Sequence, residues 1–429
     1  MKYDALPAEL FSGNRMRLST LMVPQTLAVF NSNDIMPTNA DGSMGFRQNS
    51  DLYYLSGIDQ EETILILFPH HPDAKFREVL FIRETNEHIA IWEGHKYTRA
   101  EATSCSGIKT VFWTHQFEAI FKQMITKASG VYLNTNEHLR NASPVETRDA
   151  RFIKWCSEAY PLHQQHRIAQ HMHALRSVKS VLEIEAMKKA IAITAKGFDR
   201  VLKFVKPGVY EYEIEAELIH EFIRNRSNGF AYGPIIASGK NACVLHYTQN
   251  NNPCRDGDVL LMDVAAEYAN YASDLTRCIP VNGRFNPRQK QVYNAVKRVL
   301  LDATKLLVPG NTIEKLHREV GLMMEKELAD LGLLTLEEIK NQDPEKPAYK
   351  KYFMHGTSHF LGLDVHDVGD FSAPLAAGMV FTCEPGIYIP EEGLGIRLEN
   401  DILVTNQGPV NLMESIPLEP EDIESLMNA

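Results

Sequence analysis

Apolar, strand-like runs in the second half of this sequence end at or beside carboxylates, and no other feature constrains the fold as strongly. In the segment LLMDVAAEY, the run from Val259 to Val264 is apolar except for Asp263. An ionised carboxylate at the end of a buried strand is unfavourable unless it is paired or binds a metal ion. Asp263 is therefore expected to be paired or metal-bound.

The same pattern recurs at three further acids. Asp274 follows in SDLTR, after the segment AAEYANYA, which can turn the chain so that two paired strands place both aspartates in one pocket. Glu384 comes directly after the apolar run from Gly378 to Cys383, and Glu399 lies in GIRLEND, within the strand-like run from Gly395 to Val404. Each acid alone could cap a turn, but the repeated placement favours a common site.

A histidine-rich segment, HGTSHFLGLDVHD, lies between these acids and contains His355, His359 and His366. A single histidine is usually structural, whereas three in one short glycine-containing segment indicate a functional site more strongly. The neighbouring Asp364 and Asp367 are expected to be structural.

The candidate metal ligands are four carboxylates and one imidazole: Asp263, Asp274, His359, Glu384 and Glu399. This donor set suits manganese, cobalt or zinc better than a thiolate site would, and its charge of about −4 matches two divalent ions. Two such ions, roughly 3.5–4 Å apart, can share carboxylates and hold a hydroxide, because metal binding lowers the pKa of water to about 7. No glycine-rich phosphate loop or G-x-S-x-G elbow competes with this interpretation.

The length of 429 residues predicts two domains, with a boundary near residue 175 that gives domains 1–175 and 176–429. The N-terminal part has a mixed α/β pattern, with strands expected at Thr63–Phe68, Val79–Ile82 and Val131–Leu133 and a helix at Phe117–Lys127. From Phe152 to Ala195 the pattern becomes charged and helical. Further helices are expected at Glu211–Asn225, Pro287–Leu307 and Thr312–Leu331, and a loop at Leu336–Lys351.

The charge and cysteine content exclude several classes of protein. Acids outnumber bases 55 to 44, for a net charge of −11, and no basic cluster suggests a nucleic-acid partner. The N-terminal sequence predicts no signal peptide, and no apolar run approaches the ~20 residues of a membrane span. Six cysteines without a C-x-x-C pair predict reduced thiols and a cytoplasmic location.

The ordered segments LLMDVAAEY, SDLTR, HGTSHFLGLDVHD, CEPGIYI and GIRLEND resemble the pita-bread metallopeptidase family. Within it, FRQNSDLYYLSG at positions 46–57 and the histidine segment resemble the Xaa-Pro aminopeptidases, also called aminopeptidase P. The resemblance implies a two-domain α/β fold, in which a mixed α/β domain precedes a catalytic pita-bread domain of α+β, pseudo-two-fold architecture. It also implies two metal ions, with manganese (Mn²⁺) favoured over Co²⁺, Zn²⁺ or Fe²⁺, and a homodimer or homotetramer.

The resemblance further implies a role for each ligand. Asp274 and Glu399 would bridge both metals, Asp263 would bind one, and His359 and Glu384 the other. Glu384 would also carry a proton from the attacking water toward the leaving amine.

Four more residues gain roles from the resemblance. His246, in VLHYTQN, would lie over the substrate and support the scissile carbonyl, and His366 would also contact the substrate. His355 and Arg397 would complete the substrate pocket. Without the resemblance, His246 is an ordinary loop histidine and Arg397 an ion-pair partner of Glu399.

The implied activity is hydrolysis of the bond between an N-terminal residue and a following proline in peptides, by attack of a metal-bridging hydroxide. An Xaa-Pro bond lacks an N–H and restricts the preceding residue, so a dedicated pocket is expected. A prolidase that cleaves Xaa-Pro dipeptides is the nearest alternative, and a metal-free binding protein with the same fold is an alternative of another class. Methionine aminopeptidase activity is a third alternative, which the large N-terminal domain disfavours because methionine aminopeptidases generally lack one.

Overall fold

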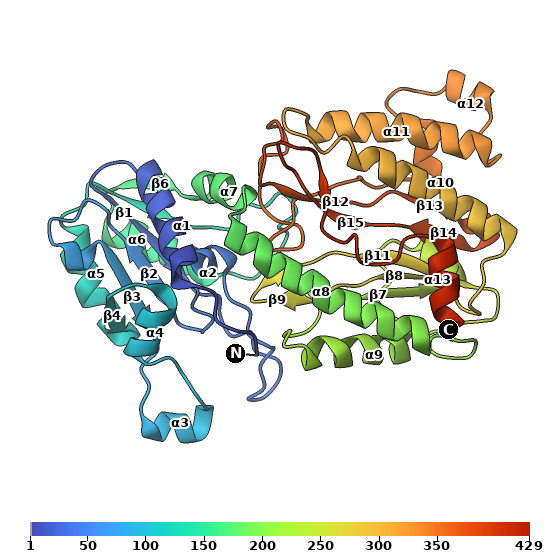
Figure 1. The fold of residues 1–429 in the computed structure, drawn as a ribbon. Helices are drawn as coiled ribbons and strands as arrows, with labels where there is room; N and C mark the ends of the chain where they lie inside the picture. The colour runs from blue at the N-terminus through green and yellow to red at the C-terminus, as the bar shows by residue number, and fades with distance from the viewer. Residues whose placement is uncertain (1) are drawn as a thin grey trace. The chain divides into compact units, whose positions relative to one another are not determined.

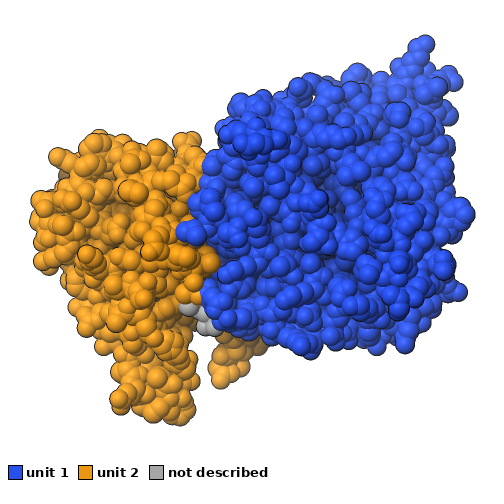
Figure 2. Space-filling model, viewed as in Figure 1, with its two compact units in different colours: residues 1–4, 177–429 blue, residues 5–176 orange. Residues whose placement is uncertain are grey.

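The computed structural model describes residues 2–429, which form two compact units (Figure 2). One unit contains Ala5–Arg176, and the other contains residues 2–4 and 177–429. The first residues belong to the C-terminal unit because Asp4 forms an ion pair with Arg226 at 2.6 Å and a contact with the Tyr268 hydroxyl at 3.2 Å.

The N-terminal unit is built on one six-stranded mixed sheet with the order β4-β3-β2-β1-β5-β6. β1 is antiparallel to β2 and parallel to β5, while β3 is parallel to β4. The strands are β1 (Thr26–Asn31), β2 (Ile64–Leu67), β3 (Glu78–Ile82), β4 (Thr110–Trp113), β5 (Gly130–Leu133) and β6 (Gln164–Arg167). The helices are α1 (Ala8–Leu21), α2 (Ser50–Ser56), α3 (Glu87–Glu93), α4 (Arg99–Ser106), α5 (Phe117–Ile125), α6 (Arg148–Ala159) and α7 (Ala169–Ser177).

The core of this unit forms where apolar strands meet the apolar face of α5. Phe117, Phe121 and Met124 of α5 are buried against residues such as Val29 and Phe81 of β1 and β3. The three predicted strands and the predicted helix are confirmed as β2, β3, β5 and α5. The helical stretch expected from residue 152 onward is wrong in one place, because β6 interrupts it. That strand, QQHR, is polar and mostly exposed, so no apolar alternation marked it.

The C-terminal unit consists of two similar halves, each a helix pair followed by an antiparallel sheet. The first half has α8 (Val181–Phe204) and α9 (Glu211–Arg224) with the sheet β11-β8-β7. The second has α10 (Pro287–Thr304) and α11 (Ile313–Asp330) with the sheet β12-β15-β16. Figure 1 shows the strands lying between the two helix pairs. This arrangement confirms the pita-bread fold.

The strands of this unit are short and end around one central region. They are β7 (Ile235–Ser238), β8 (Val259–Asp263), β9 (Glu267–Tyr268), β10 (Tyr271–Ala272), β11 (Thr276–Pro280), β12 (Val380–Cys383), β13 (Gly386–Ile389), β14 (Leu394–Arg397), β15 (Asn400–Leu403) and β16 (Val410–Asn411). β14 pairs with β13 and packs against β8 and β11, which joins the two halves. A final helix, α13 (Pro420–Met427), follows.

The predicted turn in AAEYANYA is confirmed as the β9–β10 hairpin. Its two central residues, Ala269 and Asn270, have φ values of 51° and 65°, which is the backbone of a tight two-residue hairpin turn. β8 and β11 then pair antiparallel, with Asp263 opposite Thr276.

Two expectations for this unit are wrong. The loop expected at Leu336–Lys351 contains the short helix α12 (Leu336–Lys340), which Thr335 and Glu338 start with a capping box, and a 3₁₀ turn at Ala348–Lys351. The single run expected from Gly395 to Val404 is two strands, β14 and β15, which belong to different sheets. The chain changes sheets at Leu398 and Glu399, so the break places this glutamate at the centre of the unit.

Candidate metal centre

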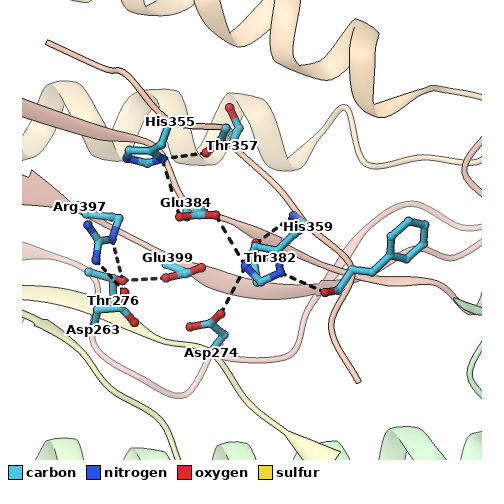
Figure 3. Close-up of polar contacts among 12 residues, drawn as sticks. Asp263, Asp274, Thr276, His355, Thr357, His359, Thr382, Glu384, Arg397 and Glu399 are labelled. Atoms are coloured by element: carbon cyan, nitrogen blue, oxygen red, sulfur yellow. Dashed lines mark hydrogen bonds and ion pairs between the residues drawn. The ribbon is translucent and has the colours of Figure 1, made fainter. Parts of the chain in front are cut away.

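The five predicted ligands converge from strand ends of the C-terminal unit (Figure 3). Asp263 is the last residue of β8, Asp274 precedes β11, Glu384 follows β12 and Glu399 lies between β14 and β15. His359 lies beside β12, where its backbone N–H donates to Thr382 Oγ1 at 3.2 Å and its carbonyl accepts from Thr382 N at 3.0 Å. The structure therefore brings all five side chains together.

The geometry is tightest around Asp274, His359 and Glu399. One ligand atom from each lies within 4.8 Å of the others. His359 Nε2 is 3.4 Å from Asp274 Oδ2 and 3.7 Å from Glu384 Oε1. His359 Nδ1 lies 3.0 Å from the Phe360 carbonyl, and this contact orients the ring so that Nε2 faces the acids.

Burial and mutual repulsion disfavour the ionised form of the acids in this cluster. Burial raises the pKa of Glu384 to about 7. The positive charges of His359 and Arg397 oppose this rise, whereas the negative charges of Asp274 and Asp263 add to it. Burial, followed by the charges of Asp274 and Glu384, also raises the pKa of Glu399 well above its usual range. Close, buried carboxylates cannot all ionise without a compensating cation.

The pKa values of Asp263 and His359 are also shifted by burial and by neighbouring charges. Burial raises the pKa of Asp263, although Arg397 opposes that effect. Burial lowers the pKa of His359, but the neighbouring Asp274 and Glu384 raise it above its ordinary value overall.

The donor set fits divalent metal ions. Four carboxylates and one imidazole carry a charge of about −4, which two divalent ions would neutralise, and oxygen-rich sites of this kind suit manganese, cobalt, zinc or iron. The nearby Cys383 does not contribute, because its Sγ lies 3.9 Å from the Leu300 carbonyl and burial raises the pKa of the thiol to about 12.

Arg397 forms one wall of the site, and its ion-pair partner differs from the expected one. Its Nη2 lies 2.7 Å from Asp263 Oδ2, its Nη1 donates to the Tyr388 hydroxyl at 2.9 Å, and its Nε donates to Thr276 Oγ1 at 3.2 Å. The expected ion pair with Glu399 is therefore replaced by one with Asp263. The cause is the β13–β14 register, which sets Arg397 opposite Gly386 and turns its side chain toward β8.

Two of the predicted substrate histidines, His355 and His366, contact residues of this centre, whereas His246 is exposed. His355 Nε2 is 2.7 Å from the Tyr388 hydroxyl, and its Nδ1 is 3.8 Å from Glu384 Oε2. Burial, followed by Arg397, lowers the pKa of His355 to about 4, with a smaller effect of His246. His366 is exposed, and its ring packs edge-to-face against the His359 ring with the two ring centroids 4.3 Å apart.

Several site residues were not found from the sequence. The Tyr232 hydroxyl donates to Asp263 Oδ1 at 2.6 Å, and the Thr276 hydroxyl donates to Glu399 Oε2 at 2.7 Å. Tyr388 carried a weak signal, because it lies in the short strand β13 that directly follows Glu384 and Pro385 in the sequence. Tyr232 had no such signal, since it lies on an irregular segment before β7.

Comparison with known proteins shows which families the chain resembles. The model of metallopeptidase family M24 matches residues 185–406, and that of the aminopeptidase P N-terminal domain matches residues 11–132. The chain is 34% identical to an Xaa-Pro aminopeptidase of Haemophilus influenzae, covering 99% of this chain and 98% of that protein. It is 35% identical to the Xaa-Pro aminopeptidase of Escherichia coli, covering 98% of this chain and 97% of that one.

A solved structure is also similar over the full length. Zinc-substituted Escherichia coli aminopeptidase P in complex with product superposes with a TM-score of 0.88 and 32% identity, covering 99% of both chains.

Proposed function

Because the chain belongs to metallopeptidase family M24 and carries an aminopeptidase P N-terminal domain, we propose that its five converging side chains hold two divalent ions. The protein is a metallo-exopeptidase that hydrolyses the bond before a proline in second position. Its full-length similarity is to Xaa-Pro aminopeptidases, which disfavours the prolidase alternative. The complete ligand set argues against a metal-free binding protein.

The observation that carries the proposed site is the cluster of Asp274, His359 and Glu399 atoms within 4.8 Å, beside a glutamate with a pKa near 7. In the roles implied by the family resemblance, Asp274 and Glu399 would contact both ions, Asp263 would contact one, and His359 and Glu384 the other. Bound divalent ions would polarise the scissile carbonyl and lower the pKa of a water molecule to about 7.

Glu384 is the proposed proton carrier. Its carboxylate lies 3.7 Å from His359 Nε2 among the proposed ligands, where it would accept a proton from the attacking water and pass it toward the leaving amine. Its side chain is 20% exposed, more than that of His359 at 8%, so it can reach both water and the leaving proline nitrogen.

The substrate pocket is proposed to be formed by His355, Arg397, His246 and His366. His355 is neutral at pH 7 because its pKa is about 4, so it presents a hydrogen-bonding ring without a charge. His246 and His366 are both exposed and can approach a peptide from solvent. His246 would support the scissile carbonyl, while His366 would contact the substrate beside His359.

We also propose manganese as the resident metal on the basis of the family resemblance, since the carboxylate-rich donor set by itself suits manganese, cobalt, zinc or iron. Residues 1–175 are proposed as the N-terminal aminopeptidase P-like domain and 176–429 as the catalytic domain, supported by the compact units and the family matches. A homodimer or homotetramer is supported by exposed Ile91 and Trp92 of α3, which are 78% and 79% exposed.

A cytoplasmic location is proposed on the basis of the cysteines, since all six are free thiols. Among residues 2–429, no helix is long and apolar enough to cross a bilayer.

A peptidase assay tests the function. Tripeptides with proline in second position, the matching Xaa-Pro dipeptides and tripeptides with alanine in second position are compared after chelation and after addition of Mn²⁺. We expect metal-dependent release of the first residue from the proline tripeptide and little from the others. Release that persists without metal, or that favours the dipeptide, would contradict the proposal.

A further inference from the structure

A second buried carboxylate, Glu211, lies outside the metal centre and binds the segment that carries His246. Glu211 is the first residue of α9 and its side chain is fully buried. Its Oε1 accepts hydrogen bonds from Ser238 N at 2.8 Å, Ser238 Oγ at 2.8 Å and Asn241 Nδ2 at 3.2 Å. Its Oε2 accepts from the Tyr247 hydroxyl at 2.8 Å and Asn252 N at 2.9 Å.

These five donors bracket the segment 238–252. Ser238 ends β7, Asn241 lies in the 3₁₀ turn Gly239–Cys243, Tyr247 follows His246 directly, and Asn252 closes the segment. One carboxylate thus connects the start, the middle and the end of a chain segment of fifteen residues. All five donors are neutral N–H or O–H groups, and a buried carboxylate is stabilised when several donors surround it.

Hydrogen bonds to side chains hold much of this segment. Residues 244–252 form no helix or strand, so side-chain hydrogen bonds replace a backbone ladder there. His246 is exposed, whereas the adjacent Tyr247 is 6% exposed and is held by Glu211. The position of the exposed imidazole therefore depends on the buried neighbour and its carboxylate partner.

A second acid on α9 supports the same segment. Glu215, one helical turn after Glu211, accepts from Asn250 Nδ2 at 2.9 Å, and Asn250 Oδ1 accepts from Ile236 N at 3.0 Å. Asn250 has a φ of 45°, so the backbone here is in the left-handed region and needs such contacts to persist.

We propose that Glu211 is a positioning residue that fixes His246 over the metal centre by anchoring residues 238–252. This inference rests on the proposed contact of His246 with substrate. Glutamine in place of Glu211 would keep the shape but set an NH₂ group against two or three of the donors. The segment would then loosen, and a displacement of about 1 Å at a substrate-contacting group can cost ~100-fold in rate.

The matched control is Glu267, another buried carboxylate, 3% exposed, that accepts from backbone N–H groups of Asn228 at 2.5 Å and Asn270 at 2.8 Å. Neither partner belongs to the segment 238–252. A purely structural effect of removing a buried carboxylate would appear equally in E211Q and E267Q.

The test uses the metal-loaded full-length enzyme and five variants: E211Q, Y247F, H246A, E211Q/H246A and E267Q. For a proline-containing tripeptide, we expect E211Q to lower kcat about 10- to 100-fold with unchanged metal content and a smaller change in KM. The double variant should be no slower than H246A, because Glu211 acts through that histidine. E267Q should lower the unfolding midpoint without loosening residues 244–252, because the hydrogen bonds of Glu267 to Asn228 and Asn270 lie outside that segment.

Hydrogen–deuterium exchange provides a readout that does not depend on activity. Peptides covering residues 244–252 should exchange faster in E211Q than in wild type and in E267Q, with or without metal. If E211Q does not fold, Y247F removes one donor while retaining the ring, and the same pattern is expected with a smaller fall in kcat.

The outcomes separate the inference from the proposed function. If H246A is impaired but E211Q slows H246A further by its full single-variant factor, or if exchange of residues 244–252 is unchanged, the positioning role is wrong. If H246A has wild-type kinetics while chelation abolishes activity, the substrate role of His246 is wrong and the inference fails with it, although the metal-dependent function stands.

Discussion

The raised pKa of Glu384 makes a quantitative prediction for the metal-free protein. Burial among other acids raises this pKa from the ordinary value of 4.5 to about 7. Between those pH values the folded chain binds more protons than the unfolded chain, so the free energy of unfolding falls as the pH rises. The difference between the two pKa values lowers the free energy of unfolding by about 3 kcal/mol. This loss of stability is complete above pH 7 and absent below pH 4.5.

The perturbation that isolates this effect is E384Q, since glutamine has nearly the same shape and does not titrate. Other groups titrate in the same range: the pKa of His355, lowered to about 4 by burial and Arg397, makes stability rise with pH. Because His355 is present in both proteins, its contribution cancels in the difference between them. Metal-free wild type and E384Q should be similarly stable near pH 4.5, and wild type about 3 kcal/mol less stable at pH 8.

Urea unfolding of both proteins after chelation, at intervals from pH 4.5 to 8, measures this difference. Adding Mn²⁺ should reverse the trend, because metal binding requires deprotonated ligands and stabilises the folded state increasingly as the pH rises. A stability difference that stays constant with pH, or that favours wild type at pH 8 without metal, would refute the assignment of a buried, proton-binding Glu384.

Three further results are expected. D274N should lose bound metal, measured by elemental analysis, and lose activity by at least ~100-fold, because this acid lies 3.4 Å from His359 within the cluster; full metal content would contradict its role as a ligand. R397M should leave Asp263 without its 2.7 Å ion pair, raise KM and alter metal affinity. R397K should recover only part of the function, because lysine cannot make all three contacts of the arginine. Equal behaviour of the two variants would argue against this geometry. K179M should break the 3.3 Å ion pair with Asp367, both side chains being 1% exposed, and lower the free energy of unfolding by about 3–5 kcal/mol; a loss below about 1 kcal/mol would show that the pair is not effectively buried.

Elements with a strong local pattern were predicted well from the sequence. The apolar strands β2, β3, β5 and β8 and the amphipathic helices α8 to α11 carry their period in consecutive residues, and the hairpin between β8 and β11 follows from a short turn segment. The polar edge strand β6 and the short helix α12 were missed, because neither carries an apolar alternation and proline residues near α12 favoured a loop.

In the candidate site, too, local features were predicted from the sequence and long-range contacts were not. The types of the five candidate donors and their positions at strand ends are local properties, so the amino-acid sequence alone was enough to predict that they share a site. Their hydrogen-bond partners are not local: Arg397 meets Asp263 across 134 positions and Tyr247 meets Glu211 across 36.

The sequence by itself therefore predicted the two-domain organisation and the candidate carboxylate and histidine donors, because hydrophobic burial makes an acid at the end of an apolar strand unfavourable without a partner. Only the tertiary structure decided which partner each side chain has. Strand register turned Arg397 toward Asp263, the change of sheet at Leu398 and Glu399 brought that glutamate inward, and α9 placed Glu211 beneath the His246 segment. Such pairings depend on the packing of elements distant in the chain, which no local pattern encodes.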